Sequence, residues 1–154
     1  MPVNLPYEHS ARGSLKTVKA MFNIDTLLRF VGRQEWLRVG LRYYTINRFV
    51  NPKRSGSRHF EVNFYGLKYK GDLGQYIDWW VYYFGAYEKA ELLLMRDIVA
   101  RRRNAVCVDV GANVGQHSLF LSRYCAEVHA FEPLQYFVAA LQCQIIPAAN
   151  KKFR

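Results

Sequence analysis

The chain has 154 residues, 51% of them hydrophobic and 16% aromatic, which is enough for one globular domain with a core. No apolar run approaches the roughly 20 residues of a membrane-spanning helix, and the N-terminus lacks the apolar core of a signal peptide. The formal net charge is +10, most of it early in the chain, because residues 1–60 hold eleven Lys and Arg against three Asp and Glu.

A basic flank of this kind can attract nucleic acid, an anionic membrane surface or an acidic partner, but a solvated basic face has the same composition. The three cysteines, Cys107, Cys125 and Cys143, are odd in number and form no Cys-x-x-Cys pair. They indicate reduced, buried or half-buried thiols rather than a disulfide framework or a zinc site. We therefore expect a cytoplasmic protein.

Residues 1–20 contain two prolines and a glycine without hydrophobic periodicity and are interpreted as a lead-in. From residue 21 to residue 50 the apolar residues recur at helical spacing, and two glycines divide this stretch into two short helices. The apolar stripes are Ile24, Leu27, Leu28 and Val31, then Trp36, Leu37, Val39 and Leu41. The polar faces hold Arg29, Arg33, Arg38, Arg42 and Arg48. Such helices can lie on a membrane surface, although helices packed on their own domain show the same pattern.

Residues 51–57, NPKRSGS, have the composition of a linker. They divide the chain into a basic N-terminal segment, residues 1–57, and a second unit, residues 58–154. Directly after the linker, apolar residues alternate with polar ones on both sides of Tyr65-Gly66. This alternation predicts a β-hairpin.

Residues 71–85 contain six aromatic side chains. Aromatic residues beside basic ones can stack nucleobases, but these rings are consecutive rather than interleaved with Lys or Arg, so we expect buried rings and no nucleic-acid partner. Residues 88–103 are predicted to form a helix with cations in its last turn, where they complement the helix dipole. One face of this helix holds Tyr87, Ala90, Leu94 and Ile98, and its last turn holds Arg101, Arg102 and Arg103.

A turn that contains Gly111 and Gly115 follows an apolar run, residues 106–108, which ends at Asp109. Glycines at these positions allow positive φ angles and let a ligand lie against bare backbone. A helix is expected to begin between residues 113 and 116 and to point its free amide donors at that ligand. The pattern therefore predicts a strand, a glycine turn and a helix that together form a docking surface.

A carboxylate ends the next predicted strand. Residues 128–131 close on Glu132, 17 positions after the second glycine, where a carboxylate can accept hydrogen bonds from both hydroxyls of a ribose. A dinucleotide fingerprint has glycines at the first, third and sixth positions of the turn, but here the third is Asn113 and the sixth is Gln116, which argues against NAD. Read separately, Asp109 is a strand-end cap and Glu132 a surface acid.

The sequence DVGANVG at residues 109–115, followed by AFEP at residues 130–133, resembles the first two cofactor motifs of S-adenosylmethionine-dependent methyltransferases, and more narrowly those of the FkbM family. In that family a Gly-x-Tyr-Glu element precedes the first strand, and GAYE at residues 85–88 matches it. A helix cap explains Glu88 equally well. The matching segments together cover roughly residues 60–145.

The resemblance implies an α/β fold, a Rossmann-like class I methyltransferase sheet that is incomplete at the C-terminus and is preceded by a β-hairpin and basic N-terminal helices. It implies S-adenosylmethionine as the cofactor. The residues matched to cofactor binding are Asp109, Gly111, Ala112, Asn113, Gly115, Glu132 and Glu88. No residue is identified as a catalytic base, and no metal site is expected.

The function implied by the resemblance is methyl transfer to a hydroxyl of a small molecule, a sugar or a lipid. Transfer from a sulfonium is an in-line displacement, so the enzyme mainly positions donor and acceptor. Two other classes stay open, a truncated remnant that at most binds the cofactor and a basic module that associates with a membrane or with nucleic acid. The oligomeric state does not follow from the sequence.

Overall fold

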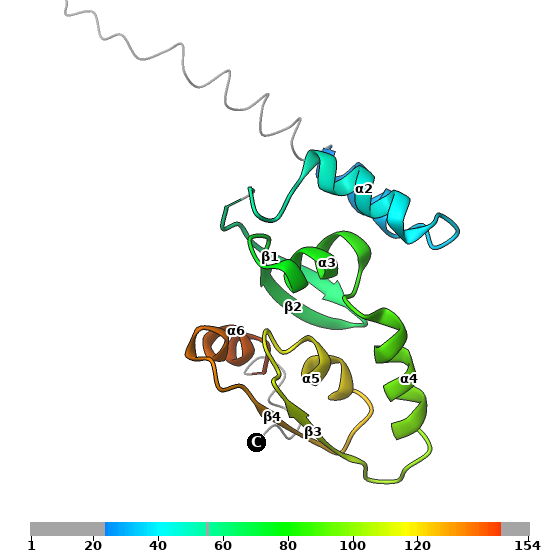
Figure 1. The fold of residues 1–154 in the computed structure, drawn as a ribbon. Coiled ribbons are helices and arrows are strands. Elements are labelled where there is room, and N and C mark those ends of the chain that lie inside the picture. The colour runs from blue at the N-terminus through cyan, green and yellow to red at the C-terminus, as the bar shows by residue number, and fades with distance from the viewer. Residues whose placement is uncertain (1–23, 55, 146–154) are drawn as a thin grey trace, which may run out of the picture.

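The computed structural model of the chain describes residues 24–54 and 56–145. It shows a mixed α/β structure with one antiparallel hairpin, one parallel strand pair and helices packed around them (Figure 1). The predicted lead-in at residues 1–20 lies outside the described residues. In chain order the elements are a helix over residues 24–32, α2 Val39–Phe49, β1 His59–Phe64, β2 Leu67–Asp72, α3 Tyr76–Phe84, α4 Lys89–Val99, β3 Val106–Val110, α5 Gln116–Leu121, β4 Glu127–Phe131 and α6 Gln135–Ile145.

The strands β1 and β2 form the predicted antiparallel hairpin. Its turn residues, Tyr65 and Gly66, have φ angles of 51° and 82°. Positive φ at both positions gives the turn the twist that paired strands need. Alternate side chains, Val62, Phe64 and Tyr69, are buried. The hairpin prediction is therefore confirmed.

Two hydrophobic cores meet at α3. The first lies among the hairpin, α4, α5 and β4, and includes the fully buried Phe64 and Phe120. The second lies between α3 and the N-terminal helices and includes Trp79 and Tyr83. Because Val81 belongs to the first core, α3 contributes to both. Three of the six aromatic rings, Trp79, Tyr83 and Phe84, are buried, and Trp80 and Tyr82 are half-buried against them, so the prediction of buried rings is confirmed in part.

A buried carboxylate fastens α3 to the hairpin. Asp78, only 3% exposed, accepts hydrogen bonds from the Tyr69 hydroxyl at 2.5 Å and from the Asp72 amide at 2.8 Å. Burial raises the pKa of Asp78 to about 6, although both hydrogen bonds act to lower it. Gly71 leaves room for this contact, since a Cβ there would lie 2.8 Å from the Asp78 Cγ.

The two N-terminal helices dock on α3 partly through arginines. The guanidinium of Arg29 lies over the Tyr82 ring at 4.6 Å, and that of Arg42 lies over the Phe84 ring at 5.7 Å. Arg42 also donates to the Gly32 carbonyl at 2.7 Å, which joins the two helices. Planar guanidinium groups stack well on aromatic rings, so these two arginines take inward positions that were predicted to be polar and outward.

The predicted apolar stripes are accordingly wrong in part. Leu28 is buried as expected. The exposed members of the stripes are Ile24, Leu27, Trp36, Val39 and Leu41. The periodicity identifies both helices correctly, but it does not identify the face that each turns to the core. None of the helices in the described part of the chain is long and apolar enough to cross a membrane.

Helix α4 is shorter than predicted and is packed through another face. It ends at Val99, so residues 101–103 lie in the turn beyond it and not in its last turn. Its buried residue is Leu92, whereas Leu94 and Ile98 of the predicted face are exposed. Both faces of this helix carry apolar side chains, so helical periodicity alone does not select the buried one.

The strands β3 and β4 form a parallel pair, with α5 in the connection between them. This confirms the predicted order of strand, turn, helix and strand. One face of the pair packs on the first core through Cys107 and Val128. On the other face Val106, Val108 and Val110 are exposed. A larger Rossmann sheet is not shown, because the two sheets of the described residues have two strands each.

Asp78 is expected to make the fold less stable as the pH rises from about 4 to about 6. Its folded-state pKa lies above the ordinary value of 3.8, so the folded protein keeps a proton that the unfolded chain releases. The resulting stability is complete below pH 3.8 and is lost as the pH rises through about 6, a fall of about 3 kcal/mol in the free energy of unfolding. Urea unfolding at several pH values measures this fall.

In Asp78→Asn the fall should disappear, because an amide does not titrate in this range. Glu91→Gln, which removes an exposed carboxylate from α4, is the matched control and should keep the wild-type profile. Parallel pH profiles for the wild type and Asp78→Asn would show that another group causes the dependence.

Candidate functional site

The glycine turn between β3 and α5 is fastened to the end of β4. The amides of Gly111 and Ala112 both donate to the Phe131 carbonyl, at 2.8 and 3.0 Å. Gly111, Asn113 and Gly115 have φ angles of 81°, 51° and 82°. This is the left-handed region that glycine adopts freely and asparagine tolerates. The two glycines therefore stand where the backbone requires them.

Glu132 lies against this turn. Its Oε2 accepts a hydrogen bond from the Asn113 amide at 2.7 Å, and its Oε1 accepts one from the Leu134 amide at 2.8 Å. The structure thus brings the acid that follows β4 together with the turn that follows β3. A carboxylate has about four acceptor positions, so each of its oxygens can still accept a hydrogen bond from a hydroxyl group of a ligand.

Asp109 lies at the same end of the strand pair and bonds to α5. Its Oδ2 accepts a hydrogen bond from the Ser118 hydroxyl at 2.5 Å, and Ser118 is fully buried. Asp109 therefore links β3 to α5. This structural role resembles that of the strand-end cap, which the sequence left open as an alternative to cofactor binding. Its second oxygen remains an acceptor.

The turn offers fewer free amide donors than predicted. The amides of residues 111–113 already bind Phe131 and Glu132, and the Gly115 amide donates to the Ala112 carbonyl at 2.8 Å. Ala112 is buried, so its methyl group packs into the protein. A tight turn satisfies its own backbone groups first, which is why these donors are engaged within the protein.

The turn has one open backbone position and one buried acceptor without a partner. A Cβ at Gly111 would have no other heavy atom within 4 Å, so the backbone there is open. The Asn113 Oδ1 is buried and has no hydrogen-bond partner among the described residues. A buried acceptor without a partner destabilises a protein, so a donor on a ligand would relieve that cost.

The segment of residues 85–88 is held beside the turn by Gln116. The Gln116 side chain, 1% exposed, accepts a hydrogen bond from the Tyr87 amide at 2.7 Å and donates one to the Tyr87 carbonyl at 2.9 Å. Directly after Tyr87, the Glu88 Oε2 lies 3.7 Å from the His117 Nε2. Glu88 stands at the N-cap position of α4, as the capping interpretation has it, but its side chain makes no hydrogen bond that caps the helix.

Gln116 is the site residue that sequence reasoning missed. Its amide side chain carries one donor group and one acceptor, which match the carbonyl and amide of a backbone residue. Its partner, Tyr87, lies 29 residues earlier in the chain. No local pattern in the sequence signals a contact over that separation.

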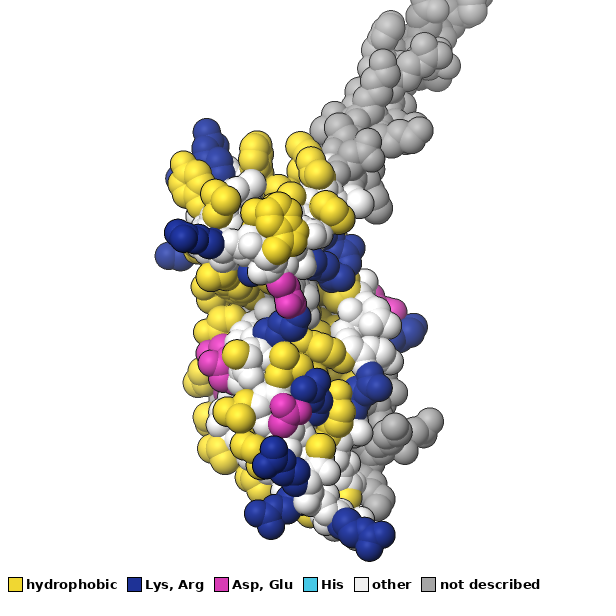
Figure 2. Space-filling model, turned by 90° about the vertical axis from the view of Figure 1, so that its right-hand side faces the viewer, with side chains coloured by type: hydrophobic (Ala, Val, Ile, Leu, Met, Phe, Trp, Pro, Cys, Tyr) yellow, Lys and Arg dark blue, Asp and Glu magenta, His cyan; other side chains and the backbone are white. Residues whose placement is uncertain are grey.

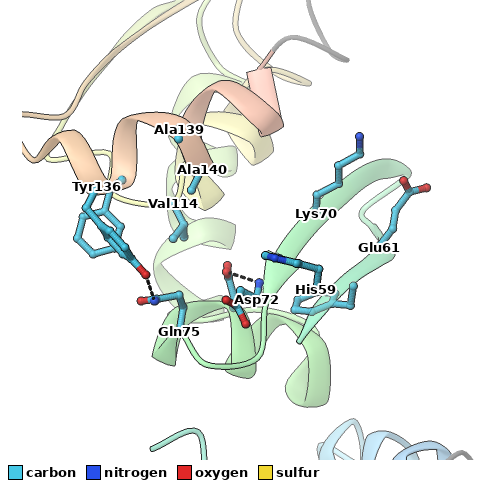
Figure 3. A pocket seen from close by; sticks show the side chains of 13 residues that line it. His59, Glu61, Lys70, Asp72, Gln75, Val114, Tyr136, Ala139 and Ala140 are labelled. Atoms are coloured by element: carbon cyan, nitrogen blue, oxygen red, sulfur yellow. Dashed lines mark hydrogen bonds between the residues drawn. The ribbon is translucent and has the colours of Figure 1, made fainter. Parts of the chain in front are cut away.

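A cavity of about 700 Å³ opens beside the turn, between the hairpin and α6 (Figure 3). Val114 of the turn forms part of its wall, and His59 and Asp72 reach it from the hairpin side. Gln75 donates a hydrogen bond to the Tyr136 hydroxyl at 2.7 Å, which joins the end of the hairpin to α6. The volume is typical of small-molecule sites.

Two of the three cysteines, Cys107 of β3 and Cys125 in the connection from α5 to β4, lie next to each other. The Sγ atoms of Cys107 and Cys125 are 2.7 Å apart, and both residues are free and half-buried, as expected. Burial, with a contribution from the neighbouring thiol, raises the pKa of Cys125 to about 12. A thiol with such a pKa is a poor nucleophile near neutral pH. Among the described residues no group of three metal-ligating side chains is found.

Comparisons of the chain with protein-family models, with curated proteins and with solved structures find no match. The resemblance to the FkbM family therefore depends on residues 85–88, 109–115 and 130–133 alone. The Phe131 carbonyl and the Glu132 carboxylate join residues 109–115 to residues 130–133. Gln116, which directly follows residues 109–115, bonds to Tyr87 of residues 85–88.

Replacing Gln116 by alanine is expected to detach residues 85–88 from the turn. The substitution leaves the amide and carbonyl of Tyr87 without their partners, at a cost of about 2 to 4 kcal/mol in the free energy of unfolding. Urea denaturation measures the loss. Gln116→Glu should also destabilise the fold, because a carboxylate cannot donate to the Tyr87 carbonyl and its charge would be buried without a partner.

Gln142→Ala, on the exposed side of α6, is the matched control and should change stability by less than about 0.5 kcal/mol. If Gln116→Ala and Gln142→Ala were equally stable, the link through Gln116 would contribute nothing.

Proposed function

We propose that this chain is an S-adenosylmethionine-dependent methyltransferase of the FkbM type, with β3 and β4 as neighbouring strands of a Rossmann-like sheet. The observation that carries the proposal is the hydrogen bond between the Glu132 carboxylate and the Asn113 amide. It joins the glycine turn after one parallel strand to the acid after its neighbour. Nucleoside ligands bind at such a place, outside the carboxyl ends of parallel strands.

The turn suits this cofactor in three respects. Gly111 leaves open space against which the methionine part could lie. Asn113 keeps a buried oxygen that a donor on the ligand would satisfy. Glu132 keeps acceptor positions for the two hydroxyls of a ribose. When bound, the cofactor would supply the electrophilic methyl group.

Two further carboxylates suit the positive charge of this cofactor. Asp109 stands at the end of β3, and Glu88 is placed beside α5 through the Gln116 link. Negative charge at the site favours a sulfonium and an ammonium over a neutral ligand. Gly115 and Ala112 have structural roles, the first as the left-handed residue that begins α5 and the second as a buried support of the turn.

The methyl acceptor would occupy the cavity beside the turn. Val114 and Phe137 give it apolar walls, and His59, Lys70 and Asp72 give it polar groups on the hairpin side. This combination suits a small molecule, a sugar or a lipid with a hydroxyl group. Holding such an acceptor in line with the donor is the main requirement of a methyl transfer.

Calorimetric titration of the 154-residue chain with S-adenosylmethionine should show binding that NAD does not reproduce. Glu132→Ala is expected to weaken this binding by about tenfold or more, because it removes hydrogen bonds worth about 0.5 to 1.5 kcal/mol each. Asp97→Ala removes an exposed carboxylate from α4 and should leave the affinity unchanged. Circular dichroism shows whether each variant is folded.

An assay of methyl transfer to sugar and lipid hydroxyls distinguishes a methyltransferase from a protein that only binds the cofactor. Binding without transfer would favour the alternative, a protein that binds the cofactor but does not catalyse. The absence of binding by a folded sample would refute both.

A further inference from the structure

Large apolar side chains are exposed on the N-terminal helices and on the turn between them. They are Ile24, Leu27, Phe30, Trp36, Val39, Leu41, Tyr44 and Phe49. Figure 2 shows hydrophobic side chains gathered at this end of the molecule, with Lys and Arg side chains beside them. We name these eight residues the docking platform. Exposed large apolar side chains gathered on one part of a surface, with polar residues among and around them, typically mark an interaction site.

The inner faces of the same helices explain why these residues stay outside. Arg29 and Arg42 stack on aromatic rings of α3, and Asp25 accepts a hydrogen bond from the Tyr83 hydroxyl at 2.8 Å. Asp25 also pairs with Arg58 at 2.7 Å. These contacts attach the helices to α3 and to the start of β1. The docking platform is therefore carried by helices that are packed against the rest of the protein through their inner faces.

A cationic groove adjoins the docking platform. It has a volume of about 880 Å³. Its charged and aromatic lining consists of Arg48, Arg54, Arg58, Asp25, Tyr44 and Phe49. Asp25 is engaged with Arg58, and within the described ranges no carboxylate pairs with Arg48 or Arg54. Guanidinium groups bind phosphate through charge-assisted hydrogen bonds, so the groove suits a phosphate group.

We propose that the docking platform binds an anionic membrane surface, with the arginines of the groove on lipid phosphates. Residues 24–54 hold seven Lys and Arg against two Asp and Glu, which complements anionic lipids. Trp36 and Tyr44, 79% and 70% exposed, combine an apolar ring with a polar group, as side chains at membrane–water interfaces do. Apolar contact and basic charge together are what surface-bound helices use.

The test is flotation of the 154-residue chain with vesicles of phosphatidylcholine alone or mixed with phosphatidylserine; it needs no cofactor. We expect binding to the mixed vesicles that weakens with salt, together with a shift of tryptophan fluorescence to shorter wavelength. Trp36→Phe should lose most of the fluorescence shift, because the two remaining tryptophans, Trp79 and Trp80, are buried and half-buried. It should keep the vesicle binding, because phenylalanine is also a large apolar residue.

Two double variants separate the apolar and the charged contributions. Trp36→Ser with Leu41→Ser should weaken the association by about tenfold or more. Arg48→Gln with Arg54→Gln should weaken it on the order of tenfold. The matched control is Arg101→Gln with Arg102→Gln, which removes the same charge from the turn after α4, at the opposite end of the molecule (Figure 1), and should keep the binding.

Equal binding by all three double variants, or no binding to either kind of vesicle, would overturn the proposal. A dimer that the Trp36 and Leu41 substitutions dissociate, without vesicle binding, would assign the docking platform to a second copy of the chain. RNA binding that the Arg48 and Arg54 substitutions abolish, again without vesicle binding, would assign the groove to nucleic acid. Either of these two results would also overturn the proposal of membrane binding.

Discussion

The buried carboxylate of Asp78 is the contact on which the arrangement of the chain depends. By accepting hydrogen bonds from the Tyr69 hydroxyl and the Asp72 amide, it holds α3 against the hairpin. Since α3 contributes to both cores, this contact also connects the hairpin to the core on which the N-terminal helices pack. A buried carboxyl group is tolerated there because it is hydrogen-bonded, and its burial raises its pKa to about 6.

The candidate cofactor site depends on a second set of polar contacts, which join segments far apart in the chain. The Phe131 carbonyl and the Glu132 carboxylate hold the glycine turn, and Gln116 holds Tyr87 beside it. The docking platform is on another part of the molecule, on the helices beyond α3 (Figure 1). A protein with this arrangement could rest on a membrane through one end and keep the turn and its cavity accessible.

Much of the secondary structure could be predicted because its causes are local. The hairpin follows from alternation around Tyr65-Gly66, and the order of strand, turn, helix and strand follows from Gly111, Gly115 and the two apolar runs. The buried faces could not be predicted in the same way. Arg29 packs inward because an aromatic ring of α3 lies opposite it, and Leu27 is left outside for the same reason.

The sequence by itself determined the hairpin, the order of strand, turn, helix and strand around the two glycines, the left-handed glycines of that turn and the carboxylate at the end of each parallel strand. Only the tertiary structure decided that Glu132 bonds to the amide of Asn113, that Gln116 holds Tyr87, and that the apolar side chains of the N-terminal helices face outward. The reason is physical. Backbone conformation depends on neighbouring residues, whereas burial and hydrogen-bond partners depend on residues that only folding brings together.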